Sequence, residues 1–102
     1  YRNEIKGDRK SIGGRQKEEH RTFTHHDLSC RPGDMLYLCS DGLADQPNSD
    51  GKKIGSKHVK TLLAEISSQP VHDQKSRILS RLHDHQQHEP QRDDITLLGV
   101  RV

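Results

Sequence analysis

The sequence has no tryptophan and few aromatic residues of any kind; aromatic side chains make up 3% of its 102 residues. Hydrophobic residues make up only 27%, whereas charged residues make up 31%. A chain this short buries a limited fraction of its surface, so its own core would be small. Because the apolar residues gather in two strand-like runs and two helix-like stripes, they favour one segment of a larger folded domain over a disordered chain.

Cysteine is scarce as well. Cys30 and Cys39 are too few for a disulfide framework, and they lack the CxxC spacing of structural zinc sites. Cys39 lies inside an apolar run and is expected to be a small core residue. We therefore expect a reducing, cytoplasmic environment, in which other segments of a longer parent protein could still provide a membrane anchor.

Long apolar runs and basic stripes are also missing. There is no run of about 18 apolar residues and no apolar signal-peptide core, so this segment is expected neither to span a membrane nor to direct its own export. The net charge is +2 with neutral histidines. The lysine and arginine residues are scattered among acidic neighbours and are not interleaved with aromatic residues, so nucleic-acid binding has little support.

The most apolar stretch runs from Met35 to Cys39 and is followed by Ser40-Asp41-Gly42. Its near-continuous apolarity predicts a core strand, either buried on both faces or central in its sheet. Arg31-Pro32-Gly33-Asp34 predicts a turn before it. We expect a hairpin-like connection there, from a strand around residues 21–28, and another short strand around residues 3–5.

Two helices are expected after a polar loop. Ser56 is a good N-cap for the first, and Ser67 to Pro70 would end it. The second is followed by a polar, histidine-rich tail and then by a final strand from Ile95 to Val102. Within each helix the apolar residues recur at helical spacing and form one stripe. The first stripe comprises Val59, Leu62, Leu63 and Ile66, and the second comprises Ile78, Leu79 and Leu82.

This order of elements predicts an α+β unit in which two helices cover one face of a largely antiparallel sheet. Asp41 closes one strand, and Asp93-Asp94 opens another. If the two strands are antiparallel neighbours, these acids lie at the same end of the sheet, within reach of one ion. Parallel neighbours would place the acids at opposite ends.

Carboxylates without neighbouring cysteine or clustered histidine suit hard cations such as Mg²⁺ and Mn²⁺. Two such ions can generate a nucleophile from water and hold the oxygens of a phosphoryl group. Spacing alone favours a simpler interpretation, in which Asp41-Gly42 is a turn and Asp93-Asp94 is a solvated strand start.

The residues themselves carry a family resemblance. The stretch from Gly33 to Gln46 resembles the late Asp-Gly motif of the PPM-type, metal-dependent serine/threonine phosphatases, and most of all their bacterial SpoIIE-like branch. Arg92 to Leu98 resembles the closing strand of that family. Gly51 to Gly55 is similar to its loop and helix entry, and Lys6 to Gly13 is similar to the strand and loop that precede the motif.

The resemblance implies an α/β/β/α sandwich with a binuclear Mn²⁺ or Mg²⁺ centre, at which a metal-activated water attacks phosphoserine or phosphothreonine of a protein. Carried over by position, Asp41 and Asp93 would each bind a metal ion. Asp94 would support these ligands, and Gly42 would let the backbone turn tightly beside the ion. No catalytic side chain is expected beyond the metal ligands.

One part of the family pattern has no counterpart here, namely the early acid and the Asp-Gly pair that bridges the two ions. Glu4 and Asp8 lack the right setting, and Gly7-Asp8 has the reverse order. We therefore expect residues 1–102 to form the C-terminal segment of a phosphatase domain. On its own, this segment is predicted to bind metal poorly and to be catalytically inactive.

The resemblance also implies a partner, a phosphorylated regulatory protein such as an anti-sigma-factor antagonist. An open sheet edge could pair with a second copy of the chain to form a homodimer. The alternative function is a non-catalytic, phosphatase-like interaction module of a bacterial signalling protein.

The eight histidines offer a weaker possibility. His25 and His26 would point to opposite faces of a strand. His85 and His88 are three residues apart near a helix end and could share a face. A zinc site there would need further ligands, and a solvated helix end is the simpler interpretation.

Overall fold

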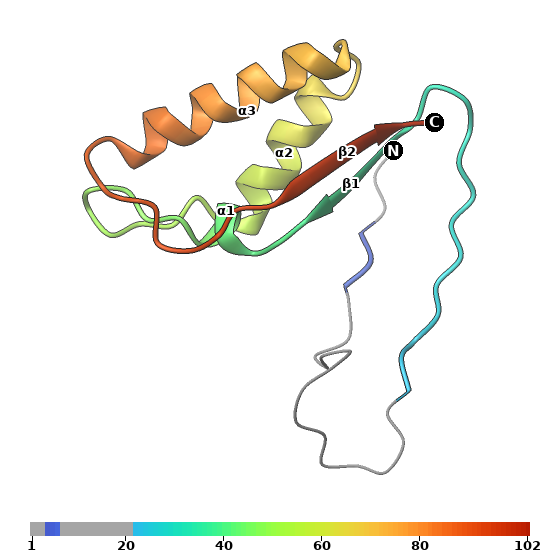
Figure 1. Ribbon diagram of the computed structural model, residues 1–102, viewed down its shortest axis with the longest axis horizontal. Coiled ribbons are helices and arrows are strands. Elements are labelled where there is room, and N and C mark those ends of the chain that lie inside the picture. The colour runs from blue at the N-terminus through green and yellow to red at the C-terminus, as the bar shows by residue number, and fades with distance from the viewer. Residues whose placement is uncertain (1–3, 7–21) are drawn as a thin grey trace.

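The computed structural model describes residues 4–6 and 22–102. Within these ranges the elements are β1 (Met35–Cys39), α1 (Gly42–Asp45), α2 (Ser56–Ile66), α3 (Val71–Gln86) and β2 (Leu97–Arg101) (Figure 1). This confirms the predicted α+β class. No helix in the described part of the chain combines the length and the apolarity that crossing a membrane requires.

The two strands form an antiparallel pair, with Met35 opposite Arg101 and Cys39 opposite Leu97. The pairing extends one step further, because the Ser40 N–H donates to the Thr96 carbonyl at 2.9 Å. The predicted antiparallel partnership between the first apolar run and the last is therefore confirmed, although β2 starts at Leu97 rather than at Ile95.

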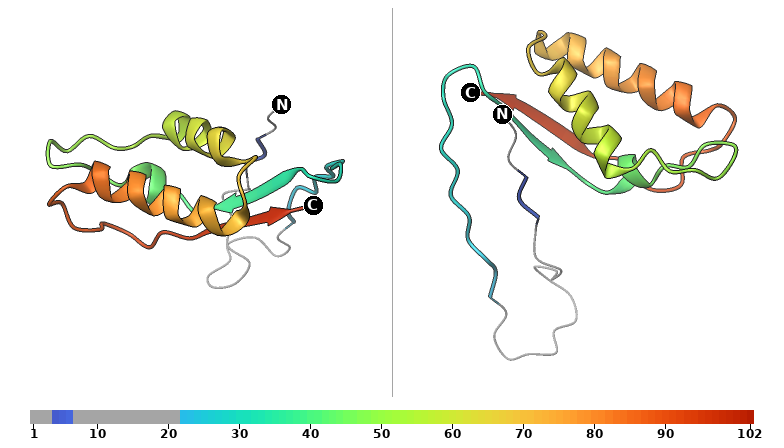
Figure 2. Two further views of the ribbon diagram at one scale, coloured as in Figure 1. Left: turned by 90° about the horizontal axis from the view of Figure 1, so that it is seen from above. Right: turned by 180° about the vertical axis from the view of Figure 1, so that it is seen from behind.

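Helices α2 and α3 cover one face of this sheet (Figure 2). The Tyr37 hydroxyl on that face donates to Gln74 Oε1 of α3 at 2.6 Å. Gly99 lies opposite Tyr37, and a Cβ on Gly99 would be only 3.2 Å from the tyrosine ring, so the glycine leaves room for the aromatic side chain. The buried cluster between helices and sheet comprises Leu43, Val59 and Leu82, with Ala44, Ile54, Leu63, Ile78, Ile95 and Leu97 packed against it.

The other face of the sheet is open. Leu38 is 67% exposed and Leu98, its partner across the strands, is 54% exposed; Leu36 and Val100 are exposed beside them. The expectation that β1 is buried on both faces is therefore wrong in the described structure, because only the helix layer lies against it. Cys39 is also exposed rather than part of the core.

The segment before β1 differs from prediction too. Residues 22–30 and 4–6 form no regular secondary structure, so the expected strands are absent there; Asn3 and residues 7–21 lie outside the described residues. The turn itself is confirmed. The Asp34 N–H donates to the Arg31 carbonyl at 3.0 Å, and Gly33 has φ of 95°, which glycine adopts without strain.

The helices follow the predicted stripes with three differences. Val59, Leu62 and Ile66 of α2 are buried as expected. The residue that caps α2 is Gly55, with φ of 87°, rather than Ser56, which is already helical. On α3, Leu79 is 41% exposed, and the polar Gln74 is buried in addition to Leu82. The short helix α1, directly after Asp41, was not expected.

Arg101 fastens the end of the sheet that lies opposite Asp41. Its guanidinium donates to the Gly33 carbonyl at 3.0 Å, to the Ser67 carbonyl at 2.9 Å and to the Gln69 carbonyl at 2.6 Å. One side chain thus joins β2, the turn before β1 and the loop between the two long helices. Charged donors bound to carbonyls make stronger hydrogen bonds than neutral donors.

Candidate metal centre

The strand ends bring the three predicted acids to the same end of the sheet. Ser40, the residue after β1, accepts the Thr96 N–H on its Oγ at 3.0 Å and donates from Oγ to the Asp94 carbonyl at 3.4 Å. These bonds tie the residue before Asp41 to the segment that carries Asp93 and Asp94. All three acids consequently lie at one end of the sheet, as antiparallel pairing requires.

Gly42 allows a closer approach at the same place. A Cβ built on Gly42 would lie 2.0 Å from the Asp94 carbonyl oxygen and 2.9 Å from the carbonyl carbon. Atoms of a folded protein do not come this close, so any side chain here would push the two segments apart. Glycine is required at position 42 because it has no side chain, not because of its conformational freedom.

The Asp41 carboxylate faces solvent. Asp41 is the N-cap residue of α1, but its side chain makes no capping hydrogen bond, and its backbone carbonyl instead accepts the Asp45 N–H at 2.9 Å. The residue is exposed. Among the described residues, no hydrogen bond or ion pair engages the Asp41 carboxylate, so both of its oxygens remain available to a ligand.

The Asp93 carboxylate is partly engaged by its own chain. Its Oδ1 accepts the Asp94 N–H at 2.7 Å, which leaves Oδ2 for another partner. Gln91 Nε2 donates to the Asp93 carbonyl at 2.8 Å and steadies the same turn. Asp94 is exposed, and its carbonyl is the group that meets Ser40 and Gly42.

Gln46 is a positioning residue that sequence reasoning missed. It is buried, its Nε2 donates to the Pro90 carbonyl at 3.0 Å, and its Oε1 accepts the Arg92 N–H at 3.1 Å. It thus joins the end of α1 to the segment that leads into Asp93. A glutamine in a polar stretch carries no sequence signal for this role.

The other residues considered for a site are engaged elsewhere. His85 Nε2 lies 3.0 Å from the Gln46 carbonyl, whereas His88 is exposed beyond the end of α3. Glu4, considered for the early acidic motif, forms an ion pair with Lys60 of α2, and this hydrogen bond lowers the pKa of Glu4. Asp8 lies outside the described residues.

The donors at this end of the sheet fit part of a metal shell. Asp41, Asp93 and Asp94 offer exposed carboxylate oxygens, which suit Mg²⁺ or Mn²⁺. Desolvation of the sulfur and the nearby Asp41 carboxylate raise the pKa of the Cys39 thiol. Nowhere in the described ranges do three His, Cys, Asp or Glu side chains converge to hold an ion. The remaining ligands would have to come from other groups.

Comparisons with known proteins identify the family of this chain. The family model described as Stage II sporulation protein E (SpoIIE) matches residues 12–102. Among solved structures, the SiaA-PP2C domain of Pseudomonas aeruginosa matches with a TM-score of 0.75 and 31% sequence identity. The match covers 80% of this chain but only 34% of that one. A search of curated proteins gave no match. The chain belongs to the SpoIIE family of PPM-type phosphatase domains.

Proposed function

We propose that this chain supplies the C-terminal part of a metal-dependent protein serine/threonine phosphatase domain, in which Asp41 and Asp93 bind Mn²⁺ or Mg²⁺. The observation that carries the proposal is the junction of the two strand ends, where Ser40 bonds to both Thr96 and Asp94 and the Gly42 backbone lies against the Asp94 carbonyl. In this proposal, two carboxylates that lie 52 positions apart in the sequence, Asp41 and Asp93, serve the same end of the sheet.

Each residue has a definite task in this proposal. Asp41 binds through its free carboxylate, and Asp93 binds through Oδ2 while Oδ1 keeps its bond to the Asp94 N–H. Ser40 and Asp94 hold the two strand ends in place, and Gln46 fixes the approach to Asp93. When bound, the ions supply the activated water and stabilise charge on the phosphoryl group.

The family resemblance supports a proposal for the substrate class. We propose phosphoserine or phosphothreonine of a regulatory protein, such as an anti-sigma-factor antagonist, met in the cytoplasm. Because this chain spans about a third of the matched PP2C chain, activity is assigned to the complete domain. The 102 residues alone are expected to give no turnover of a phosphoserine peptide with Mn²⁺, and normal turnover would contradict the assignment.

Titration with Mn²⁺ tests the ligands. We expect weak binding by the unaltered chain and a further loss, about tenfold or more, in Asp41→Ala and in Asp93→Ala. Asp50→Ala removes an exposed carboxylate from the loop before α2 and serves as a charge-matched control that keeps wild-type binding. Identical Mn²⁺ binding in all four proteins would remove Asp41 and Asp93 as ligands.

A second candidate function is a non-catalytic, phosphatase-like interaction module. One observation favours it, namely that no three donors of the described residues converge on one point. If a complete domain containing this chain binds a phosphorylated partner without hydrolysing it at saturating Mn²⁺, this candidate is the correct one.

A further inference from the structure

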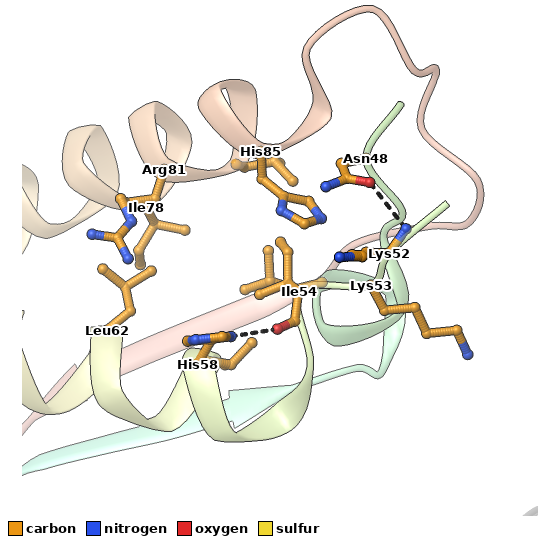
Figure 3. A pocket seen from close by; sticks show the side chains of 12 residues that line it. Asn48, Lys52, Lys53, Ile54, His58, Leu62, Ile78, Arg81 and His85 are labelled. Atoms are coloured by element: carbon orange, nitrogen blue, oxygen red, sulfur yellow. Dashed lines mark hydrogen bonds between the residues drawn. The ribbon is translucent and has the colours of Figure 1, made fainter. Parts of the chain in front are cut away.

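A pocket of about 330 Å³ lies between α2, α3 and the loop that joins α1 to α2 (Figure 3). This volume is at the lower end of the roughly 300–1,000 Å³ typical of small-molecule sites. Its floor is apolar and includes all three residues of the buried cluster. The floor residues are Leu43, Ile54, Val59, Leu62, Ile78 and Leu82.

The polar residues around this floor bear positive charge or can acquire it, apart from Asn48. Arg81 comes from α3 and Lys52 and Lys53 come from the loop, and no aspartate or glutamate lines the pocket. Lys53 lies 3.6 Å from Asp45 and extends away from the pocket in Figure 3. The guanidinium of Arg81 and the ammonium of Lys52 form no ion pair with any described residue, so two cations remain uncompensated.

Two histidines are held in place at the same pocket. His58 Nδ1 lies 2.9 Å from the Ile54 carbonyl, and His85 Nε2 lies 3.0 Å from the Gln46 carbonyl. A carbonyl only accepts hydrogen bonds, so these ring nitrogens carry the hydrogen. The second nitrogen of a neutral ring is an acceptor, so either histidine could donate to an acidic head group only in its protonated form. Both rings are already held in place before a ligand binds.

We propose that this pocket binds a small amphiphilic anion. Its apolar body covers Leu62, Ile78 and Leu82, and its acidic head group pairs with Arg81, whose guanidinium extends over the α2 side of the pocket in Figure 3. Lys52 lies at the other end of the pocket in Figure 3 and adds only a longer-range attraction. The fork of N–H donors on arginine matches a carboxylate or phosphate, while the apolar floor disfavours a wholly hydrophilic anion. None of Asp41, Asp93 and Asp94 lines the pocket, so the proposal is independent of metal binding.

The test uses octanoate, which has an acidic head and an apolar body of suitable size, with octanol and inorganic phosphate as partial ligands. Amide chemical shifts of the 102-residue chain report both the affinity and the place of binding. We expect saturable octanoate shifts in α2, α3 and residues 52–54, weaker binding of octanol and no saturable binding of phosphate.

Two matched variants isolate the head-group contact. Arg81→Gln should weaken octanoate binding about fivefold or more and leave octanol unchanged. Arg77→Gln makes the same change of charge one helical turn earlier on α3, outside the pocket, and should bind octanoate like wild type. Asp41→Ala should also keep wild-type octanoate affinity, so this proposal and the metal proposal fail separately.

Several results would overturn the proposal. Octanol could bind as tightly as octanoate, or Arg81→Gln could leave octanoate affinity unchanged. An equal loss in Arg77→Gln would mean that net charge alone is responsible. Shifts confined to Leu36, Leu38, Leu98 and Val100 would place the ligand on the open sheet face instead.

Discussion

The two faces of the β1–β2 sheet both carry apolar side chains but have different surroundings. On one face, Tyr37 and Leu97 lie under α2 and α3, and a hydrogen bond from Tyr37 reaches Gln74. On the other, Leu38 and Leu98 are paired across the strands and more than half exposed. A strand that is apolar on both sides is typical of a sheet between two layers. The helix face therefore stabilises this chain. The open face is suited to a second layer of protein, as the implied α/β/β/α sandwich would provide.

The sharpest test of this difference compares one leucine from the core with one from the open face. Leu82→Ala should lower the free energy of unfolding by about 3 kcal/mol, because it leaves a cavity in the buried cluster. Leu38→Ala removes the same atoms from an exposed position and should change stability by less than about 0.5 kcal/mol. Urea unfolding measures both; equal losses would show that the open face is packed in solution.

Two glycines provide the next comparison, between the acidic end of the sheet and its middle. Gly42→Ala should cost about 2 kcal/mol in urea unfolding, because the new Cβ meets the rigid Asp94 carbonyl. Gly99→Ala should cost less than about 1 kcal/mol, since the Tyr37 ring can move aside. A harmless Gly42→Ala would contradict the close approach of the two strand ends.

A smaller loss of stability is expected from the polar contact between the sheet and α3 that joins Tyr37 and Gln74. Tyr37→Phe should lower the free energy of unfolding by about 1 kcal/mol, because buried Gln74 loses the hydrogen bond to its Oε1. Urea unfolding near neutral pH gives this value. Thr61→Val removes one exposed hydroxyl hydrogen bond on α2 and serves as a control with a smaller loss.

The same tyrosine predicts a dependence on pH. Burial raises the folded-state pKa of Tyr37 above 10, partly offset by the charge of Arg101. The folded state therefore holds this proton more tightly than the unfolded state. The corresponding stability is complete below pH 10 and is lost as the pH rises through the folded pKa. Tyr37→Phe should remove this alkaline loss, and an unchanged pH profile would contradict the burial.

The smallest change in stability is expected from a charge on the open face. Leu38→Lys should alter the free energy of unfolding by less than about 0.5 kcal/mol, because the side chain is exposed. If a second copy of the chain covers this face, sedimentation of the wild type should show dimers that Leu38→Lys abolishes. Equal sedimentation of both proteins would mean that a different protein segment, rather than a second copy of this chain, covers the open face.

Sequence reasoning predicted the parts of the fold that follow from local pattern. The apolar run of β1, the stripe of α2 and the turn at Pro32-Gly33 each depend on residues close in sequence, and all are present. The strand expected over residues 21–28 is absent from the described part of that range, since β pairing depends on a distant segment that a local pattern does not specify. Burial of Leu38 and Cys39 failed for the same reason, since burial depends on neighbouring layers.

The candidate site was predicted in outline only. The acids and their common sheet end followed from strand order and the family resemblance. The contacts that hold them together did not, because Ser40, Gln46 and the Asp94 carbonyl act across more than 40 positions of sequence. Such contacts depend on the path of the folded backbone, and no local pattern records them.

The most direct test of the central claim is the position of a bound Mn²⁺ ion, measured by paramagnetic broadening of amide signals at low Mn²⁺ concentration. We predict broadening centred on residues 40–42 and 93–95, with little effect at Arg101 and the turn at the other end of the sheet. Broadening spread evenly over the exposed acids, including Asp50 and Asp84, would contradict the claim that Asp41 and Asp93 form one metal-binding centre.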